Sequence, residues 1–169
     1  MKKLLIAASA AALTAAAFAA PNPATATFDV KLTVVKACSV TAGTASTIDF
    51  GSADANPAAN LDATSNISVT CSKGTAYTIG LTPTNNSTGG AGTMAGTGSN
   101  TDTVAYQLRK TSAAGTAWGN TNTNGTTVGN GVAGTGTGTA QSIPVYATVP
   151  STNVTPDTYK DTVTVTVRY

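Results

Sequence analysis

The sequence contains no histidine and no glutamate, and only 9% of its residues are charged. Without histidine, the chain lacks the side chain most used for proton transfer near neutral pH and the commonest protein metal ligand. The shortage of Glu and Lys also excludes a coiled coil, which needs both in quantity. We therefore predict no metal centre and no cofactor, and an enzyme is the least favoured class of function.

Basic residues are also scarce, with nine Lys and Arg against seven Asp. Lys2 and Lys3 lie in a predicted export signal, and without them seven basic residues face seven acidic ones. A nearly neutral chain cannot form the basic stripe that binds nucleic-acid phosphates. We therefore expect no nucleic-acid partner.

The N-terminus has the pattern of a signal peptide. The two lysines precede an apolar run over residues 4–13, and Ala17-Phe18-Ala19 fits the small-residue cleavage pattern. A transmembrane anchor needs about 20 strongly apolar residues, whereas this run is short, rich in Ala and followed by two prolines. We predict a signal peptide over residues 1–19, and no membrane anchor in the mature chain. Cleavage after residue 26 is the alternative, because Ala24-Thr25-Ala26 fits the same pattern.

Two cysteines remain, Cys38 and Cys71, in a chain predicted to reach an oxidising compartment. An intramolecular disulfide is the expected state there. It closes a loop of about 34 residues, for which the chain-entropy model gives about 3.5–4 kcal/mol of stabilisation. A reactive catalytic thiol is the competing interpretation, but the chain has no histidine to activate it.

Apolar and polar residues alternate with a period of two along much of the mature chain. This pattern is typical of strands half-buried in an antiparallel sheet. No segment after the signal peptide has an apolar period of 3.6 residues. The fold class predicted is therefore all-β, a sandwich of antiparallel sheets. The predicted strands run through residues 28–34, 48–50, 67–71, 77–81, 104–108, 143–149 and 163–169.

Two stretches rich in Gly, Thr, Asn and Ser, residues 85–100 and 119–139, interrupt the alternation. Such segments bury too little apolar surface to order themselves alone, so we predict long surface loops or loosely paired edges. The single tryptophan, Trp118, stands beside the second stretch. A core residue that anchors the loop is the favoured interpretation of Trp118, and a platform for a sugar ring is the alternative.

Several short motifs follow one another in a specific order over essentially the whole mature chain. They are Cys38-Ser39-Val40, Ile48-Asp49-Phe50-Gly51, residues 61–71, Tyr77-Thr78-Ile79-Gly80-Leu81, residues 104–108, Trp118-Gly119, residues 136–146 and residues 159–169. In this order they resemble the spore coat protein U domain family. Despite its name, that family is similar to the secreted pilin subunits of archaic chaperone–usher pili in Gram-negative bacteria.

The resemblance implies assembly rather than catalysis. Pilins of this kind have an incomplete immunoglobulin-like antiparallel β-sandwich that lacks its last strand, and a donor strand from a partner completes it. A periplasmic chaperone fills the groove first. At the outer-membrane usher, the N-terminal extension of the next subunit then replaces the chaperone. The implied partners are identical or related pilin subunits, the chaperone and the usher, and the implied location is a cell-surface pilus reached through the periplasm.

The same resemblance assigns roles to two apolar segments. Residues 20–34 form an N-terminal extension with a donor strand at about 24–34, and residues 35–169 form the pilin domain. The donor face consists of Ala26, Phe28, Val30, Leu32 and Val34. The C-terminal groove strand, which the chaperone also contacts, presents Val163, Val165, Val167 and Tyr169. From the alternation alone, residues 28–34 could equally be the first strand of the chain's own sheet.

Two functions follow. The first is a polymerising pilus subunit, a shaft subunit because it has a single domain, that serves surface attachment and biofilm formation. The second is a monomeric secreted β-sandwich that binds a carbohydrate or another envelope component through its Gly/Asn/Thr-rich loops. The N-terminal segment separates the two hypotheses, since a binding module has no use for an apolar alternating segment beyond its own sheet.

Overall fold

A computed structural model describes residues 22–43 and 46–169. The predicted signal peptide, residues 1–19, lies outside these described residues. The chain divides into two units, residues 1–34 and residues 35–169, and each is described by itself. Within the described ranges, no helix is long and apolar enough to cross a membrane.

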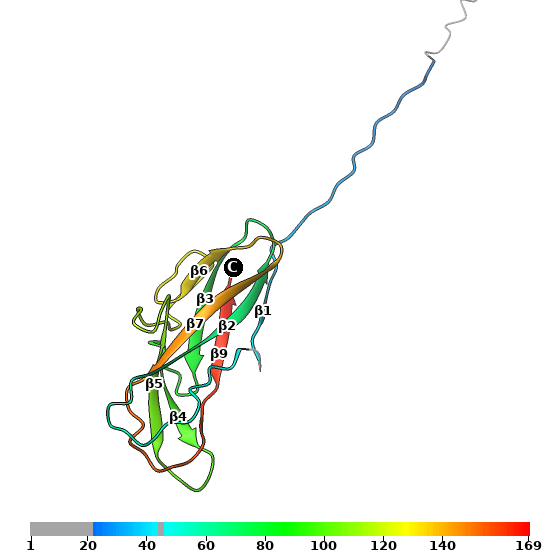
Figure 1. Cartoon of the computed structure of the whole chain (residues 1–169). Coiled ribbons are helices and arrows are strands. Elements are labelled where there is room, and N and C mark those ends of the chain that lie inside the picture. The colour runs from blue at the N-terminus through cyan, green and yellow to red at the C-terminus, as the bar shows by residue number, and fades with distance from the viewer. Residues whose placement is uncertain (1–21, 44–45) are drawn as a thin grey trace, which may run out of the picture. The chain divides into compact units, whose positions relative to one another are not determined.

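The second unit is built from antiparallel β-strands (Figure 1), which confirms the predicted fold class. The strands are β1 (Cys38–Thr41), β2 (Leu61–Cys71), β3 (Ala76–Pro83), β4 (Ala91–Gly96), β5 (Thr103–Arg109), β6 (Val132–Thr135), β7 (Ala140–Val149), β8 (Tyr159–Lys160) and β9 (Val163–Arg168). Their Thr-rich, alternating composition suits a pleated sheet with one buried face.

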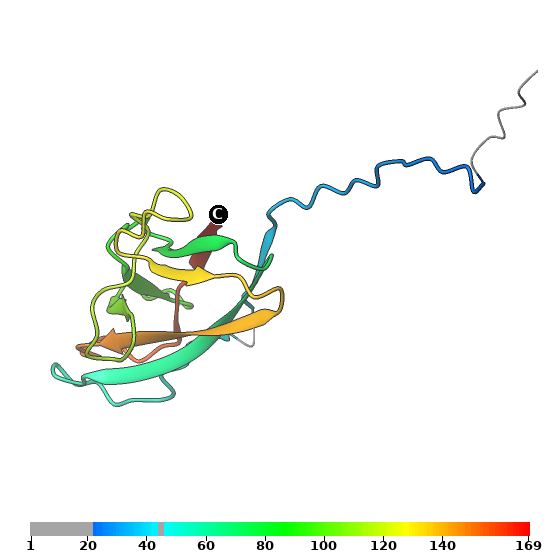
Figure 2. The ribbon, with the colours of Figure 1, turned by 90° about the horizontal axis from the view of Figure 1, so that it is seen from above.

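The strands form two sheets. The larger sheet has the order β1-β2-β7-β5-β4-β8, and the smaller one has the order β6-β3-β9. The longest ladder joins β2 to β7, from Leu61 opposite Val149 to Thr70 opposite Ala140. Seen from above, β2 and β7 lie on one side of the unit and β3 and β6 lie on the other (Figure 2). The core therefore forms between the two layers.

The core is filled by alternate residues of the facing strands. Its buried members are Ile67, Val69, Cys71, Tyr77, Ile79, Leu81, Val104, Tyr106, Leu108, Trp118, Val145, Ala147 and Val149. Most belong to the strands that the alternation predicts. Fully burying a side chain the size of Val or Leu contributes about 1.5–3 kcal/mol, so this cluster is the main source of stability.

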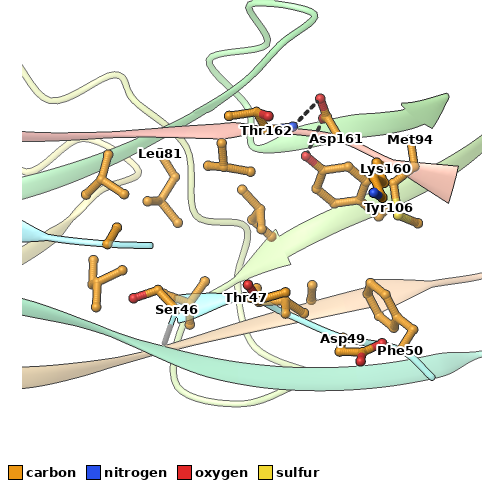
Figure 3. A pocket seen from close by; sticks show the side chains of 18 of the residues that line it. Ser46, Thr47, Asp49, Phe50, Leu81, Met94, Tyr106, Lys160, Asp161 and Thr162 are labelled. Atoms are coloured by element: carbon orange, nitrogen blue, oxygen red, sulfur yellow. Dashed lines mark hydrogen bonds between the residues drawn. The ribbon is translucent and has the colours of Figure 1, made fainter. Parts of the chain in front are cut away.

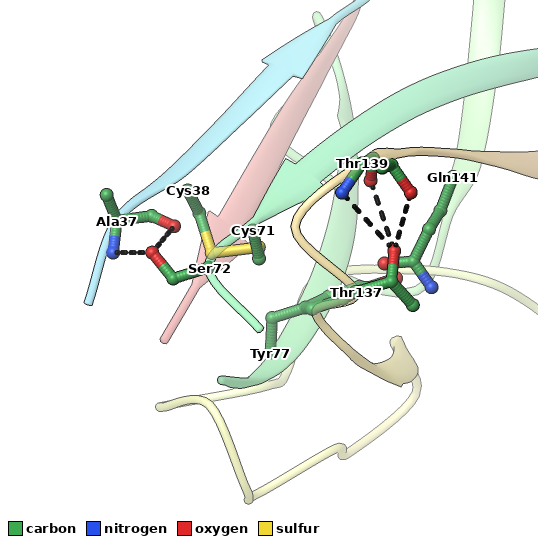
Figure 4. Close-up of a disulfide and its surroundings, with 8 residues drawn as sticks. All are labelled: Ala37, Cys38, Cys71, Ser72, Tyr77, Thr137, Thr139 and Gln141. Carbon is green, nitrogen blue, oxygen red and sulfur yellow. Dashed lines mark hydrogen bonds between the residues drawn. A yellow bond between two sulfur atoms is a disulfide. The ribbon is translucent and has the colours of Figure 1, made fainter. Parts of the chain in front are cut away.

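The predicted disulfide is confirmed, and it holds the edge strand β1 (Figure 4). Cys38 lies directly opposite Cys71 in the β1–β2 ladder. Beside it, the Ser72 hydroxyl accepts a hydrogen bond from the Ala37 amide at 3.1 Å and donates one to the Ala37 carbonyl at 3.3 Å. Three of the four residues of β1 are exposed, so the covalent link replaces the apolar burial that this strand lacks.

Each glycine-rich stretch contains one regular strand, β4 in the first and β6 in the second. Gly92 of β4 lies opposite Tyr106, and Gly134 of β6 lies opposite Tyr77. In both pairs the tyrosine ring occupies the space that a Cβ on the glycine would need. An aromatic ring from the neighbouring strand thus covers a glycine that has no side chain of its own to bury.

Within the second unit, one predicted strand is absent. Residues 48–50 form no strand, although Ile48 and Phe50 are half-buried against the core. This segment turns its alternate apolar side chains toward the core, but it pairs with no described strand. This segment forms one wall of the candidate functional site.

Candidate functional site

The last strand of the smaller sheet is an edge strand with an unevenly covered apolar face. β9 pairs with β3 alone among the described strands. The inward-facing residues of β3 are buried, and each lies opposite a residue of β9 that is only half-buried. The three pairs are Ile79–Val167, Leu81–Val165 and Pro83–Val163. The layer over β3 is therefore complete, whereas the layer over β9 is not.

An open cleft of about 680 Å³ borders two of these half-buried residues, Val163 and Val165. Its lining includes residues 46–50 on one side and residues 158–163 with Val165 on the other. In Figure 3, Ser46, Thr47, Asp49 and Phe50 line one wall, and Tyr106, Asp161 and Thr162 line the facing wall. The cleft thus runs between the segment that follows β1 and the segment that contains β8 and β9.

The interior of the cleft is mainly apolar. The residues that line it from the two sheets are Ile67, Leu81, Met94, Leu108, Val145 and Ala147. All are members of the buried core or pack against it, so the cleft is an opening into the core. Charged side chains, Asp49, Lys160 and Asp161, also belong to its lining. Such a site suits an extended segment with one apolar and one polar face.

A hydrogen-bonded tyrosine–aspartate pair lies within one wall of the cleft. The Tyr106 hydroxyl donates a hydrogen bond to Asp161 Oδ2 at 2.6 Å, and the Thr162 amide donates one to Asp161 Oδ1 at 2.7 Å (Figure 3). Burial raises the pKa of Tyr106, and the Asp161 carboxylate raises it further. Because Asp161 lies between β8 and β9, the pair ties β5 to the crossover from the larger sheet to the smaller one.

The described part of the first unit has no place in a sheet. Residues 24–34 belong to no strand or helix, so they are not a first strand of either described sheet. Their large apolar side chains are among the most exposed of the described chain, with Phe28 and Leu32 both 87% exposed. On the alternate positions, Lys31 forms an exposed ion pair with Asp29 at 3.4 Å. The segment thus presents one apolar and one polar set of side chains.

The structure places the predicted groove residues at different points. Val163 and Val165 line the cleft, and Val167 is half-buried against the core beyond it. Tyr169 follows the end of β9 and is 52% exposed. The opposite wall is residues 46–50, of which the sequence predicts only residues 48–50, as a short strand and not as part of a cleft. The spacing of Ile48 and Phe50 carried the signal that this segment faces inward.

Trp118 is a core residue, as favoured, and not a sugar platform. Its side chain is fully buried, and its indole N–H donates to the Ile79 carbonyl at 3.0 Å. After it, three asparagines reach β3 and β9. Asn120 Nδ2 donates to Thr82 Oγ1, Asn122 Nδ2 donates to Thr78 Oγ1, and the Asn124 carbonyl accepts from Thr78 Oγ1. Asn120 Oδ1 also accepts a hydrogen bond from Arg168 at 2.7 Å.

This loop therefore covers the outer face of the small sheet, and Thr78 is fully buried beneath it. The prediction of a surface loop holds for residues 119–131, but the loop is held by specific hydrogen bonds that composition does not reveal.

Within the described ranges, no three His, Cys, Asp or Glu residues cluster closely enough to hold a metal ion.

The comparisons with known proteins agree on the fold. The family model of the Spore Coat Protein U domain matches residues 24–166. The chain is similar to one chain in the crystal structure of the CsuC–CsuE chaperone–tip adhesion subunit pre-assembly complex, from archaic chaperone–usher Csu pili of Acinetobacter baumannii. The TM-score is 0.52 at 23% sequence identity, over 81% of this chain and 40% of that chain. This chain thus corresponds to less than half of that chain's length, and no curated protein sequence matches it.

Proposed function

Because the chain belongs to the Spore Coat Protein U domain family, we propose that it is a secreted, non-enzymatic structural subunit of an archaic chaperone–usher pilus. In this proposal, residues 1–19 are removed on export. A donor strand at about residues 24–34 of one subunit then fills the cleft of the next subunit, whose domain spans residues 35–169. Surface attachment and biofilm formation are the roles that such a fibre serves.

The observation that carries the proposal is the cleft beside β9. Among the described strands, β9 has a neighbour on one side only. Its inward-facing residues are half-buried, and a cleft of about 680 Å³ opens into the core next to it. An added strand would supply main-chain hydrogen bonds to the free edge of β9 and apolar side chains to the cleft. One extended segment would thus both pair with the free edge of β9 and fill the cleft.

The first unit supplies a segment of the required kind. Phe28, Val30, Leu32 and Val34 share one face of an extended chain and are all at least 80% exposed. Burying all four would contribute about 6–12 kcal/mol as an upper bound, which is comparable to the whole stability of a small domain. At about 3.3 Å per residue, residues 24–34 extend further than the six residues of β9. The donor is therefore long enough to cover the full edge.

Assembly of this kind needs a second protein before polymerisation. A free subunit exposes an unpaired strand edge and an opening into its core, which recruits strands from any chain and leads to aggregation. A periplasmic chaperone that occupies the cleft prevents this, and the outer-membrane usher is where the donor strand replaces it. Head-to-tail insertion does not close on itself, so the product is a filament.

The proposal can be tested by substitutions on the two faces of the donor segment. The Phe28→Asp/Leu32→Asp variant changes the apolar face, and the Lys31→Asp/Thr33→Asp variant is its control on the other face. Both are expressed in a periplasm with the cognate chaperone and usher. Wild type and control are expected to give an SDS-resistant ladder on unheated gels and thin fibres in negative stain. The apolar-face variant is expected to give neither.

A soluble, well-folded monomer that needs no chaperone and shows no ladder would contradict the proposal. A ladder that persists in the Phe28→Asp/Leu32→Asp variant would contradict the assigned donor face.

A further inference from the structure

The chain contains two Asn-Gly sequences, Asn124-Gly125 and Asn130-Gly131, in the loop that covers the small sheet. We propose that Asn124 is a site of spontaneous covalent modification, at which the Gly125 amide nitrogen attacks the Asn124 side chain to form a succinimide and release ammonia. Asn130 is protected from the same reaction by its hydrogen bonds. Both sites have the same Asn-Gly sequence, but their hydrogen bonds differ in the folded chain.

The side-chain oxygen of Asn124 lies where three donors converge. Oδ1 accepts hydrogen bonds from the Thr126 amide at 2.8 Å, the Thr126 hydroxyl at 2.9 Å and the Thr127 amide at 2.7 Å. Nucleophilic attack on Cγ places negative charge on this oxygen. Fixed donors aimed at an oxygen that becomes negative lower the barrier, as in the oxyanion hole of an acyl-transfer enzyme. The loop therefore activates this carboxamide.

The nucleophile and the leaving group at this site are both free. Among the described residues, the Gly125 amide and Asn124 Nδ2 donate no hydrogen bond. Asn124 is exposed to solvent, so water reaches the amino group that departs. Gly125 carries no Cβ to hinder closure of the five-membered ring.

At Asn130 the same groups are occupied. The Gly131 amide donates to the Val128 carbonyl at 2.9 Å, which withdraws the nucleophile. Asn130 Nδ2 donates to the Thr88 carbonyl at 2.7 Å, which holds the leaving group. Oδ1 accepts from the Thr121 amide and hydroxyl, both at 2.9 Å. These two donors polarise the Asn130 carboxamide much as the three donors polarise that of Asn124, so the sites differ at the nucleophile and the leaving group. Attack at Asn130 requires the hydrogen bonds of the Gly131 amide and of Asn130 Nδ2 to break first, whereas at Asn124 neither group is hydrogen-bonded to a described residue.

The reaction needs only water and hydroxide. Hydroxide removes the proton of the Gly125 amide, and its nitrogen bonds to Asn124 Cγ. The Cγ–Nδ2 bond then breaks, and the amino group takes a proton from water and leaves as ammonia. Water next adds to either carbonyl carbon of the succinimide, which reopens it as aspartate or as isoaspartate.

The two products affect the loop differently. Aspartate keeps the main chain unchanged, and its carboxylate accepts the same three hydrogen bonds. Isoaspartate adds one carbon to the main chain next to Gly125, which is buried close to the Ala76 carbonyl and the Tyr169 main chain. The extra atom displaces Gly125 from this space, so isoaspartate loosens the loop where it meets the end of β9.

The test is an ageing experiment on the full chain. The folded protein and a reduced, denatured sample are incubated at mildly alkaline pH, and the two peptides are followed by mass spectrometry that separates aspartate from isoaspartate. In the denatured chain both sites are expected to react at similar rates. In the folded chain, Asn124 is expected to react at least about tenfold faster than Asn130, with isoaspartate among the products. Thr126→Val, which removes one donor, is expected to slow Asn124 severalfold, below the hundredfold effect of a donor in a buried enzyme site.

Equal rates at Asn124 and Asn130 in the folded chain overturn the proposal. Formation of aspartate without isoaspartate also overturns it, because direct hydrolysis does not pass through the succinimide. An unchanged rate in Thr126→Val overturns the activating role of the three donors. Fluorescence of the buried Trp118 reports whether that variant is folded.

Discussion

Val165 of β9 lies directly opposite Leu81 of β3, yet Leu81 is 1% exposed whereas Val165 is only half-buried. The two side chains belong to the same inward face of the same sheet, so their environments differ only in what covers them. Both residues line the open cleft, but Leu81 belongs to the buried core on the central strand β3, whereas Val165 packs against that core from the edge strand β9. This asymmetry makes the cleft the least complete part of the core.

The first prediction is that a peptide of residues 24–34 stabilises the folded chain. The acceptor is the Phe28→Asp/Leu32→Asp variant, whose own segment is not expected to serve as the proposed donor. Refolding with peptide is expected to raise its unfolding temperature, since a ligand of the folded state at 100 times its Kd contributes about 2.7 kcal/mol. A peptide with the same two Asp substitutions is the control. Val165→Asp in the acceptor is expected to abolish the gain, and a gain that survives it would place the peptide elsewhere.

The strands with large alternating side chains were predictable from the sequence, because β-branched and aromatic residues on one face give a clear period of two. β4 and β6 were not predicted as regular strands, because Gly92 and Gly134 have no side chains of their own and depend on tyrosine rings from the neighbouring strands. The cleft was less predictable still. The apolar period of residues 163–169 indicates a buried face, but only the arrangement of the sheets reveals that Val165 is left partly uncovered.

The second prediction concerns Tyr106→Phe. The substitution removes the hydrogen bond to Asp161 and is expected to cost about 1.5–3 kcal/mol of unfolding free energy, the range for hydrogen bonds to charged groups. It should also change the alkaline limb of the stability curve. Burial raises the pKa of Tyr106 in the folded state. The contribution of Tyr106 to the unfolding free energy is therefore complete below the unfolded pKa of about 10, and it is lost as the pH rises from there toward the higher folded pKa.

Denaturant unfolding at neutral pH and above pH 10 measures both effects. Wild type is expected to lose more stability than Tyr106→Phe over this interval. A residual loss in the variant is expected from Tyr77, whose pKa burial also raises. Parallel curves for the two proteins would show that the Tyr106–Asp161 pair does not control the alkaline limb.

The third prediction compares two glycines. Gly90 has a φ of 77°, and a Cβ there would collide with the main chain of Trp118. Gly43 has open space around the same position. Gly90→Ala is expected to lower the unfolding free energy by about 2 kcal/mol or more, because backbone strain and a backbone clash add. Gly43→Ala is expected to change it by less than about 0.5 kcal/mol. Similar losses in both would mean that the Gly90 main chain can relax.

The fourth prediction concerns acid stability and two aspartates near β8. Hydrogen bonds from the hydroxyl and the amide of Thr155 hold the pKa of Asp102 below its ordinary value. The amides of Gly98 and Thr158 do the same for the pKa of Asp157. Both contributions are present above the unfolded pKa of about 3.9 and are lost as the pH falls through the lower folded values. Asp102→Asn/Asp157→Asn is expected to be less stable at pH 7 but to lose less stability below pH 4.

The fifth prediction is that the disulfide supplies a large share of the stability of this chain. Cys38 and Cys71 close a loop with a sequence separation of 33, so Cys38→Ser/Cys71→Ser is expected to lose about 3.5–4 kcal/mol of unfolding free energy. Reducing wild type should give the same loss and leave the variant unchanged. Ser72→Ala, which removes only the hydrogen bonds to Ala37, is the matched control and is expected to lose about 0.5–1.5 kcal/mol. Because β1 precedes the segment that forms one cleft wall, the serine variant is also expected to bind the peptide of residues 24–34 more weakly. Full stability without the disulfide, measured by denaturant unfolding, would mean that the β1–β2 ladder holds this wall by itself.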